Sequence, residues 1–253
     1  MRATYVGTSA AMTARDLTRK RLVLALALAV PAVFFAVVFA TTGDRLVPIT
    51  LAAAAGRVTL VEERRQSLLF ISIAATGLIS AFFASSLIQR QLGANRRLVL
   101  CGYRAAELIA ARLAVLLGII ATTALYTWLA LGLFSSPRFP IGVLLGLIVG
   151  AFAYGCYGLL VGTLFRRELE SIFAILVLVN IDAGWLQNPI YYQNAGSKWL
   201  IEALPAHYPS QVAYLSAFTS DRVGAPVAYG LAYGAAFLLA AVALYVWRMR
   251  MTR

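Results

Sequence analysis

The chain has 253 residues, of which 61% are hydrophobic and 13% charged, with a formal net charge of +12. Its mean hydropathy of +0.81 excludes an ordinary soluble domain, because the apolar residues gather into runs of about twenty, the thickness of a bilayer core. The basic residues stand mainly at the ends of those runs, as in Arg19, Lys20 and Arg21. This placement is typical of membrane topology rather than nucleic-acid binding. We therefore expect an integral membrane protein with no nucleic-acid partner.

The chain begins with a basic amphipathic leader, residues 1–21, which we expect to lie on the cytoplasmic membrane surface. An apolar run over 22–41 follows and predicts the first membrane helix, in which Pro31 is tolerated. Val38-Phe39-Ala40 resembles a signal-peptidase site, so a cleaved signal peptide is an alternative. The run is longer than a usual signal core, which favours the membrane helix.

Residues 46–61 form a shorter apolar stretch, which Pro48, Gly56 and Arg57 interrupt. We interpret it as an extracellular connection that lies on the membrane. The alternative is a further membrane helix, which would place the two termini on opposite sides.

Five more apolar runs are long enough to cross a bilayer, which takes about 20 residues. They cover 68–88, 107–134, 141–165, 169–187 and 226–247. Together with 22–41, they predict an all-α, polytopic membrane protein with six transmembrane helices. Glycines recur at four-residue spacing in two runs, as at Gly158 and Gly162 or at Gly230 and Gly234. This spacing permits close helix contacts, either within the chain or between subunits.

Six crossings place both termini on one side of the membrane. Seven of the 22 lysines and arginines then lie on the other side, namely Arg45, Arg57, Arg64, Arg65, Arg138, Lys198 and Arg222. The remaining basic residues lie on the side of the termini. Because basic residues favour the cytoplasmic side, we predict cytoplasmic N- and C-termini and a multi-pass protein of the cell inner (cytoplasmic) membrane.

The chain lacks the residues for ATP hydrolysis. A P-loop needs a Lys followed by Ser or Thr, but Lys20 precedes Arg21 and Lys198 precedes Trp199. The single histidine, His207, stands between two prolines, and we expect it on the surface. We predict no catalytic, metal or cofactor site in this chain.

Asp182 is the one acid clearly inside an apolar run, with Asn180 two residues before it. An ionisable group within a membrane helix is a functional candidate, so both residues are candidates for a cargo path. The alternative for Asp182 is a structural carboxylate that neighbouring residues hydrogen-bond. Aromatic residues are further candidates for the walls of a path or for ordinary packing, namely Phe82, Phe83, Tyr126, Trp128, Tyr154 and Tyr157.

The segment 89–106 carries an ordered set of basic and small residues, namely Arg90, Gly93, Arg96, Arg97 and Arg104, with Arg112 further along. It resembles the coupling region of ABC-2 type permeases, the membrane-spanning subunits of ABC exporters. It departs from that pattern at Gln91, where an acid is usual, at Ala94, where Thr is usual, and at Gly102, near the usual Pro. The leader 1–21 resembles the interfacial helix of this family, and residues 188–225 resemble its extracytoplasmic re-entrant segment.

The resemblance implies an export subunit that works with a separate ABC ATPase, in two copies, and with a second permease subunit, identical or homologous. ATP would bind to the partner ATPase. Coupling would use Arg90, Gly93, Arg96, Arg97 and Arg104. The cargo would be amphipathic or hydrophobic, such as a drug, a lipid or a lipid-linked glycan, and membrane lipid would surround the chain.

Two other functions remain open. A secondary carrier or a non-transporting assembly subunit would reveal itself by an inverted repeat or by dependence on an ion gradient. A membrane-embedded lipid-modifying enzyme would need a polar or metal-binding cluster at one interface, and no such cluster stands out in the sequence.

Overall fold

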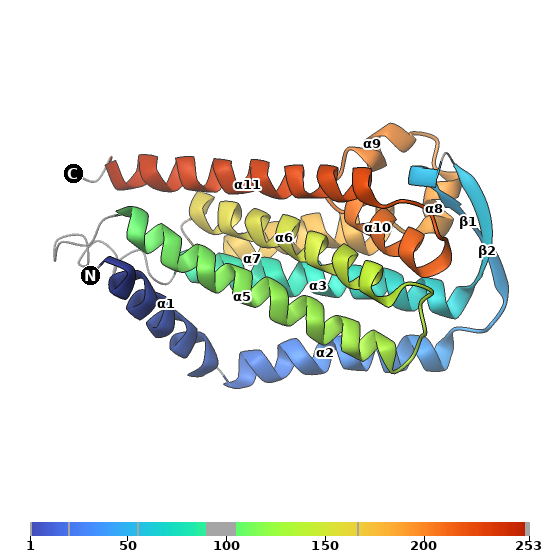
Figure 1. Cartoon of the computed structure of the whole chain (residues 1–253), viewed down its shortest axis with the longest axis horizontal. Helices are drawn as coiled ribbons and strands as arrows, with labels where there is room; N and C mark the ends of the chain where they lie inside the picture. The colour runs from blue at the N-terminus through green and yellow to red at the C-terminus, as the bar shows by residue number, and fades with distance from the viewer. Residues whose placement is uncertain (1, 20, 55, 90–104, 166, 251–253) are drawn as a thin grey trace.

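The computed structural model describes residues 2–19, 21–54, 56–89, 105–165 and 167–250. They fold into an elongated bundle of long helices with a small β-hairpin at one end (Figure 1). The elements in chain order are α1 (Arg2–Arg19), α2 (Arg21–Thr41), β1 (Leu46–Leu51), η1 (Ala52–Ala54), β2 (Arg57–Glu62), α3 (Glu63–Gln89), α5 (Ala105–Gly132), α6 (Pro140–Leu164), α7 (Glu168–Ile181), η2 (Asp182–Leu186), α8 (Pro189–Asn194), α9 (Lys198–Glu202), α10 (His207–Phe218) and α11 (Gly224–Arg250).

Five helices among the described residues are long and apolar enough to cross a membrane. They are α3, α5, α6, α7 with its extension η2, and α11. Helix α2 is 21 residues long, but its described apolar stretch, Ala27–Thr41, is shorter than a full crossing. The prediction of a helical, multi-pass membrane protein is therefore confirmed, and the runs predicted from sequence coincide closely with α5 and α6.

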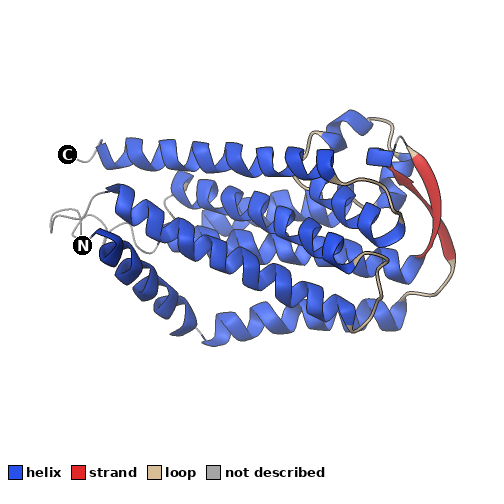
Figure 2. Ribbon diagram, viewed as in Figure 1, coloured by secondary structure: helices blue, strands red, loops and turns tan. Residues whose placement is uncertain are grey.

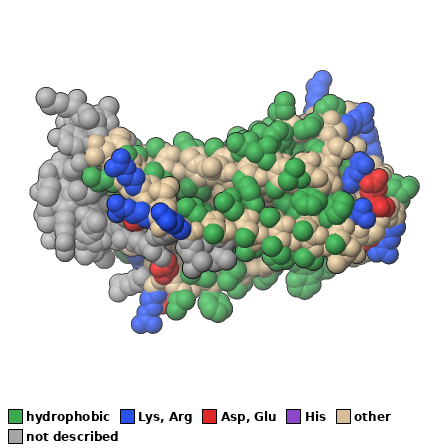
Figure 3. Space-filling model, turned by 90° about the horizontal axis from the view of Figure 1, so that it is seen from below, with side chains coloured by type: hydrophobic (Ala, Val, Ile, Leu, Met, Phe, Trp, Pro, Cys, Tyr) green, Lys and Arg blue, Asp and Glu red, His purple; other side chains and the backbone are tan. Residues whose placement is uncertain are grey.

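The two ends of the bundle differ in what they carry. Helices α1 and α5 begin, and α3, α6 and α11 end, at one end, which we name the terminal end (Figure 1). The strands and the short helices α8, α9 and α10 lie at the other, the hairpin end (Figure 2). On the face drawn in Figure 3, hydrophobic side chains cover the middle of the molecule, and charged side chains gather toward the two ends. This distribution suits a bundle whose middle lies in hydrocarbon.

Residues 46–61 belong to a β-hairpin and not to a further membrane helix. Strands β1 and β2 pair antiparallel, from Leu46 opposite Glu62 to Leu51 opposite Arg57. Gly56, at the turn, has a positive φ of 73°, a conformation that glycine adopts readily. Burial alternates along β1 because successive side chains of a strand point to opposite faces. The stretch is therefore a connection, as predicted, but one with regular strand structure.

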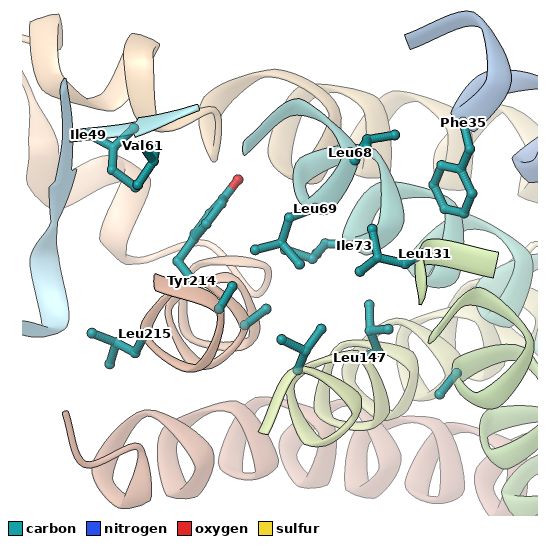
Figure 4. Close-up of a cluster of buried hydrophobic side chains, with 14 of the residues drawn as sticks. Phe35, Ile49, Val61, Leu68, Leu69, Ile73, Leu131, Leu147, Tyr214 and Leu215 are labelled. Carbon is teal, nitrogen blue, oxygen red and sulfur yellow. The ribbon is translucent and has the colours of Figure 1, made fainter. Parts of the chain in front are cut away.

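The hairpin is fixed to the bundle by both apolar and polar contacts. Ile49 and Val61 belong to one buried cluster with Leu69, Leu147 and Tyr214, which come from α3, α6 and α10 (Figure 4). The backbone N–H of Ala53 donates to the side-chain oxygen of Gln211 at 3.2 Å, and Arg57 pairs with Asp221 at 3.2 Å. Strands and α10 thus form one cap over the hairpin end of the long helices.

Helix α6 occupies the centre of the bundle and packs most extensively against α3 and α11. Its glycines make this closeness possible. A Cβ added at Gly162 would lie 2.8 Å from the carbonyl oxygen of Ser85 on α3, and one at Gly146 would lie 2.8 Å from the backbone nitrogen of Ala213 on α10. The glycine spacing therefore serves packing within the chain, one of the two roles considered for it.

Candidate functional site

The five residues proposed for coupling to an ATPase, Arg90, Gly93, Arg96, Arg97 and Arg104, lie outside the described residues. The two helix ends that flank them are described. Helix α3 ends at Gln89 and α5 begins at Ala105, both at the terminal end (Figure 1). The amide of Gln89 donates to the carbonyl oxygens of Phe165 and Arg167, each at 3.4 Å. The end of α3 is thus tied to the connection between α6 and α7.

Asp182 is completely buried where α7 gives way to the wider π-turn η2. Its carboxylate accepts three hydrogen bonds. The hydroxyl of Tyr154 on α6 donates to Oδ2, the backbone N–H of Ala206 donates to the same oxygen at 2.9 Å, and the amide of Gln187 donates to Oδ1 at 3.0 Å. Every partner is a donor, so both oxygens of the buried carboxyl group have hydrogen bonds in place of water.

His207 continues this network and is buried, with 4% of its surface exposed, so the expectation of a surface histidine was wrong. The side-chain nitrogen of Gln187 donates both to Asp182 and, at 3.1 Å, to the carbonyl of Ile201. Its oxygen therefore faces Nδ1 of His207, 3.2 Å away, and Nδ1 must carry the proton. Burial lowers the pKa of His207 to about 4, against the opposing effect of Glu202.

Asn180 does not join the Asp182 network. Its side chain is exposed, and its amide donates to the carbonyl of Leu176, one turn earlier on α7, at 2.8 Å. The two candidates for a cargo path thus lie on different faces, one turned outward and one enclosed. The enclosed, fully hydrogen-bonded Asp182 favours the structural interpretation, with its carboxylate joining α6, η2 and the start of α10.

A cavity of about 710 Å³ lies between α1, α2, α3 and α5, and we name it the side cavity. Its walls are formed by Ala10, Ala11, Ala14, Leu17 and Thr18 of α1, Leu24, Ala27 and Leu28 of α2, Ile79 and Phe83 of α3, and Ala114, Val115, Gly118, Ile119, Thr122, Thr123 and Tyr126 of α5. Phe83 and Tyr126 are two of the aromatic residues that the sequence suggested for a path. Several wall residues, including Ala14 and Gly118, are exposed, so the cavity opens on the flank of the bundle.

The few polar groups in these walls already have partners. The hydroxyls of Thr122 and Thr123 donate to the carbonyls of Gly118 and Ile119, in the second case at 2.8 Å, and that of Tyr126 donates to the carbonyl of Leu28. The cavity therefore offers hydrocarbon surface rather than free donors and acceptors. Its volume falls within the range of small-molecule pockets, about 300 to 1,000 Å³.

Arg112, on α5 near the terminal end, is a buried cation with 4% of its surface exposed. Its guanidinium lies 5.2 Å from the ring centre of Tyr245 on α11. The same tyrosine interacts electrostatically with the guanidinium and offsets part of the cost of its burial. A buried charge is costly, so Arg112 is a functional candidate near the terminal end of α5.

Within the described part of the chain, no group of three His, Cys, Asp or Glu side chains is placed to hold a metal ion. Comparison with known proteins adds no family: no protein-family model matches the chain, and no curated protein matches it significantly. The resemblance to ABC-2 permeases therefore rests on the sequence of residues 89–106 and on the order of the elements around it.

Proposed function

We propose that the chain is the membrane-spanning permease subunit of an ATP-driven ABC exporter, with ATP hydrolysis in a separate partner chain. The observation that carries the proposal is the shared end of the bundle. Helix α3 ends and α5 begins where α1 begins and α11 ends, so the two helix ends that flank the basic segment 89–106, which we name the connector, lie at the same end of the bundle as Arg2 and Arg250. One surface would then offer an ATPase the connector and the leader together.

The proposal takes α2 as the sixth crossing and the terminal end as cytoplasmic. With this orientation, most lysines and arginines lie on the cytoplasmic side, as the positive-inside rule requires. The hairpin and α8 to α10 then form the extracytoplasmic side. Residues 209–217 of α10 are buried among the long helices, which suits the re-entrant segment expected from the resemblance.

Movement of the partner would reach the spans through α3. Because Gly158 and Gly162 bring α6 close to α3, these two helices have little freedom to slide independently and would move as one body. Two ATPase subunits that close on ATP would act on the connectors of two permease subunits. The apolar flank suits an amphipathic or hydrophobic cargo, such as a drug, a lipid or a lipid-linked glycan.

Copurification tests the proposal. Tagged chain, extracted gently from its native membrane, should bring down an ATPase that contains a P-loop. Changing Arg96, Arg97 and Arg104 together to Glu should abolish recovery of the ATPase. The three negative charges would repel the ATPase surface that the three arginines attract. Single changes are too weak a test, since one exposed ion pair contributes about 0 to 1 kcal/mol.

A matched triple variant provides the control. Arg138, Lys198 and Arg222, changed together to Glu, reverse the same amount of charge at the hairpin end and should leave ATPase recovery unchanged. If the unmodified chain brings down no such ATPase, the proposal fails. If both triple variants lose the ATPase equally, the connector has no special part in docking.

A further inference from the structure

The lining of the side cavity on α1 and its lining on α2 are separated by the basic junction between these helices, which we name the basic turn. The lining residues on α1 end at Thr18, and those on α2 begin at Leu24. Between them lie Arg19, Lys20 and Arg21, and the side chains of Arg19 and Arg21 are exposed. Asp16 is the one acid in residues 1–43, so this edge of the cavity is strongly positive.

The depth of the cavity matches one leaflet of a bilayer. Its lining residues on α5 run from Ala114 to Tyr126, which spans about 18 Å at the rise of an α-helix. One leaflet of hydrocarbon is about 15 Å deep. On α2 the lining residues lie about 5 to 10 Å beyond Arg21, so apolar wall starts directly after the basic turn.

The chemistry of the walls selects hydrocarbon. Their hydroxyls donate to carbonyls of the chain itself, so a polar ligand would lose its hydration without gaining partners. Water gains nothing there either, because large apolar cavities stay dry and take up apolar molecules. Lipid acyl chains surround a protein that crosses a bilayer, so they are the apolar groups available to fill the side cavity.

We infer that the side cavity binds the acyl chains of an anionic phospholipid, whose headgroup lies against Arg19 and Arg21. Basic residues next to a membrane helix attract anionic headgroups, and the adjoining hydrocarbon slot holds the tails. Helix α1 closes the slot from one side with small residues, Ala10, Ala11 and Ala14. The lipid would thus hold α1 against α5. This inference does not depend on the proposed transport function.

Native mass spectrometry of the purified full chain tests the inference, with dioleoyl phosphatidylglycerol and dioleoyl phosphatidylcholine as probes. The unmodified chain should retain phosphatidylglycerol with a preference of about tenfold, because two arginines act on its charge. Arg19→Glu combined with Arg21→Glu should remove that preference and leave phosphatidylcholine binding unchanged. Changing both residues to Lys should keep the preference.

A second pair of variants tests the position of the tails. Gly118 lines the cavity, and a side chain added there meets no atom within 4 Å, so Gly118→Leu should fill the slot and reduce binding of both lipids about tenfold. Gly132, at the end of the same helix, also has free space around it but lies outside the side cavity, so Gly132→Leu is the matched control. Thr122→Leu replaces Gly118→Leu if circular dichroism shows that the latter does not fold.

Two results would overturn the inference. Equal binding of the two lipids by the unmodified chain would show that no headgroup is recognised. Unchanged binding in a folded cavity-filling variant would place the tails elsewhere. The readout contains neither an ATPase nor transport, so failure of the proposed function would leave this result unaffected.

Discussion

At the scale of single residues, Asp182 shows how a buried carboxylate can be held by a complete set of donors. Both of its oxygens accept hydrogen bonds, from Gln187 on one side and from Tyr154 and Ala206 on the other. An asparagine has one acceptor oxygen, so it cannot replace both. Replacing the carboxylate of Asp182 with an amide is therefore not a conservative change in this fold.

We predict that Asp182→Asn lowers the free energy of unfolding by roughly 1 to 3 kcal/mol and that Asp182→Leu lowers it further, because Leu can accept none of the three hydrogen bonds. Thermal unfolding in detergent measures the order of stability of the original protein, Asp182→Asn and Asp182→Leu. Asn180→Leu is the control, since that exposed side chain lies outside the network and should shift stability by no more than about 0.5 kcal/mol. An Asp182→Leu protein as stable as the original would remove the structural role.

At the scale of elements, the contact of α6 with α3 depends on glycines that leave no room for a methyl group. We predict that Gly162→Ala lowers the free energy of unfolding by about 1 to 3 kcal/mol, because its Cβ would press on the carbonyl of Ser85. Gly118→Ala is the matched control. Its Cβ meets no neighbour, and alanine favours the helix, so stability should be unchanged or rise by up to about 1 kcal/mol.

Thermal unfolding of the two variants, measured in the same detergent, provides the comparison. The opposite order, with Gly162→Ala the more stable, would mean that α6 and α3 are not in close contact. The glycine spacing would then be better explained by the alternative, an interface between subunits.

At the scale of the whole molecule, the arrangement predicts which sites share a side of the membrane. A reporter fused after Arg253 should report a cytoplasmic position, and one inserted after Asn194, at the end of α8, an extracytoplasmic one. The physical reason is the excess of basic residues toward the terminal end together with the six crossings proposed above. An insertion after Gly43, before the hairpin, should behave like the one after Asn194. Reporters after Arg253 and Asn194 on the same side would contradict six crossings.

The sequence by itself determined the membrane class and the positions of the long helices. A run of about twenty apolar residues is a local property, and in a bilayer such a run satisfies its backbone hydrogen bonds only as a helix or in a closed barrel. The predicted runs therefore agree closely with α5 and α6. The sequence also singled out Asp182, since an acid within an apolar run is conspicuous without knowledge of its neighbours.

The tertiary structure decided everything that depends on distant segments meeting. The strand structure of the hairpin was accessible in part from the β-branched residues around Gly56, but its attachment required α10. The sequence around His207 does not predict that this side chain is buried, because its hydrogen-bond partner Gln187 lies 20 residues away. The side cavity likewise arises only where residues of α1, α2, α3 and α5 line a common space. Apolar runs specify helices one at a time, whereas hydrogen-bond partners and cavities arise from how several helices pack together.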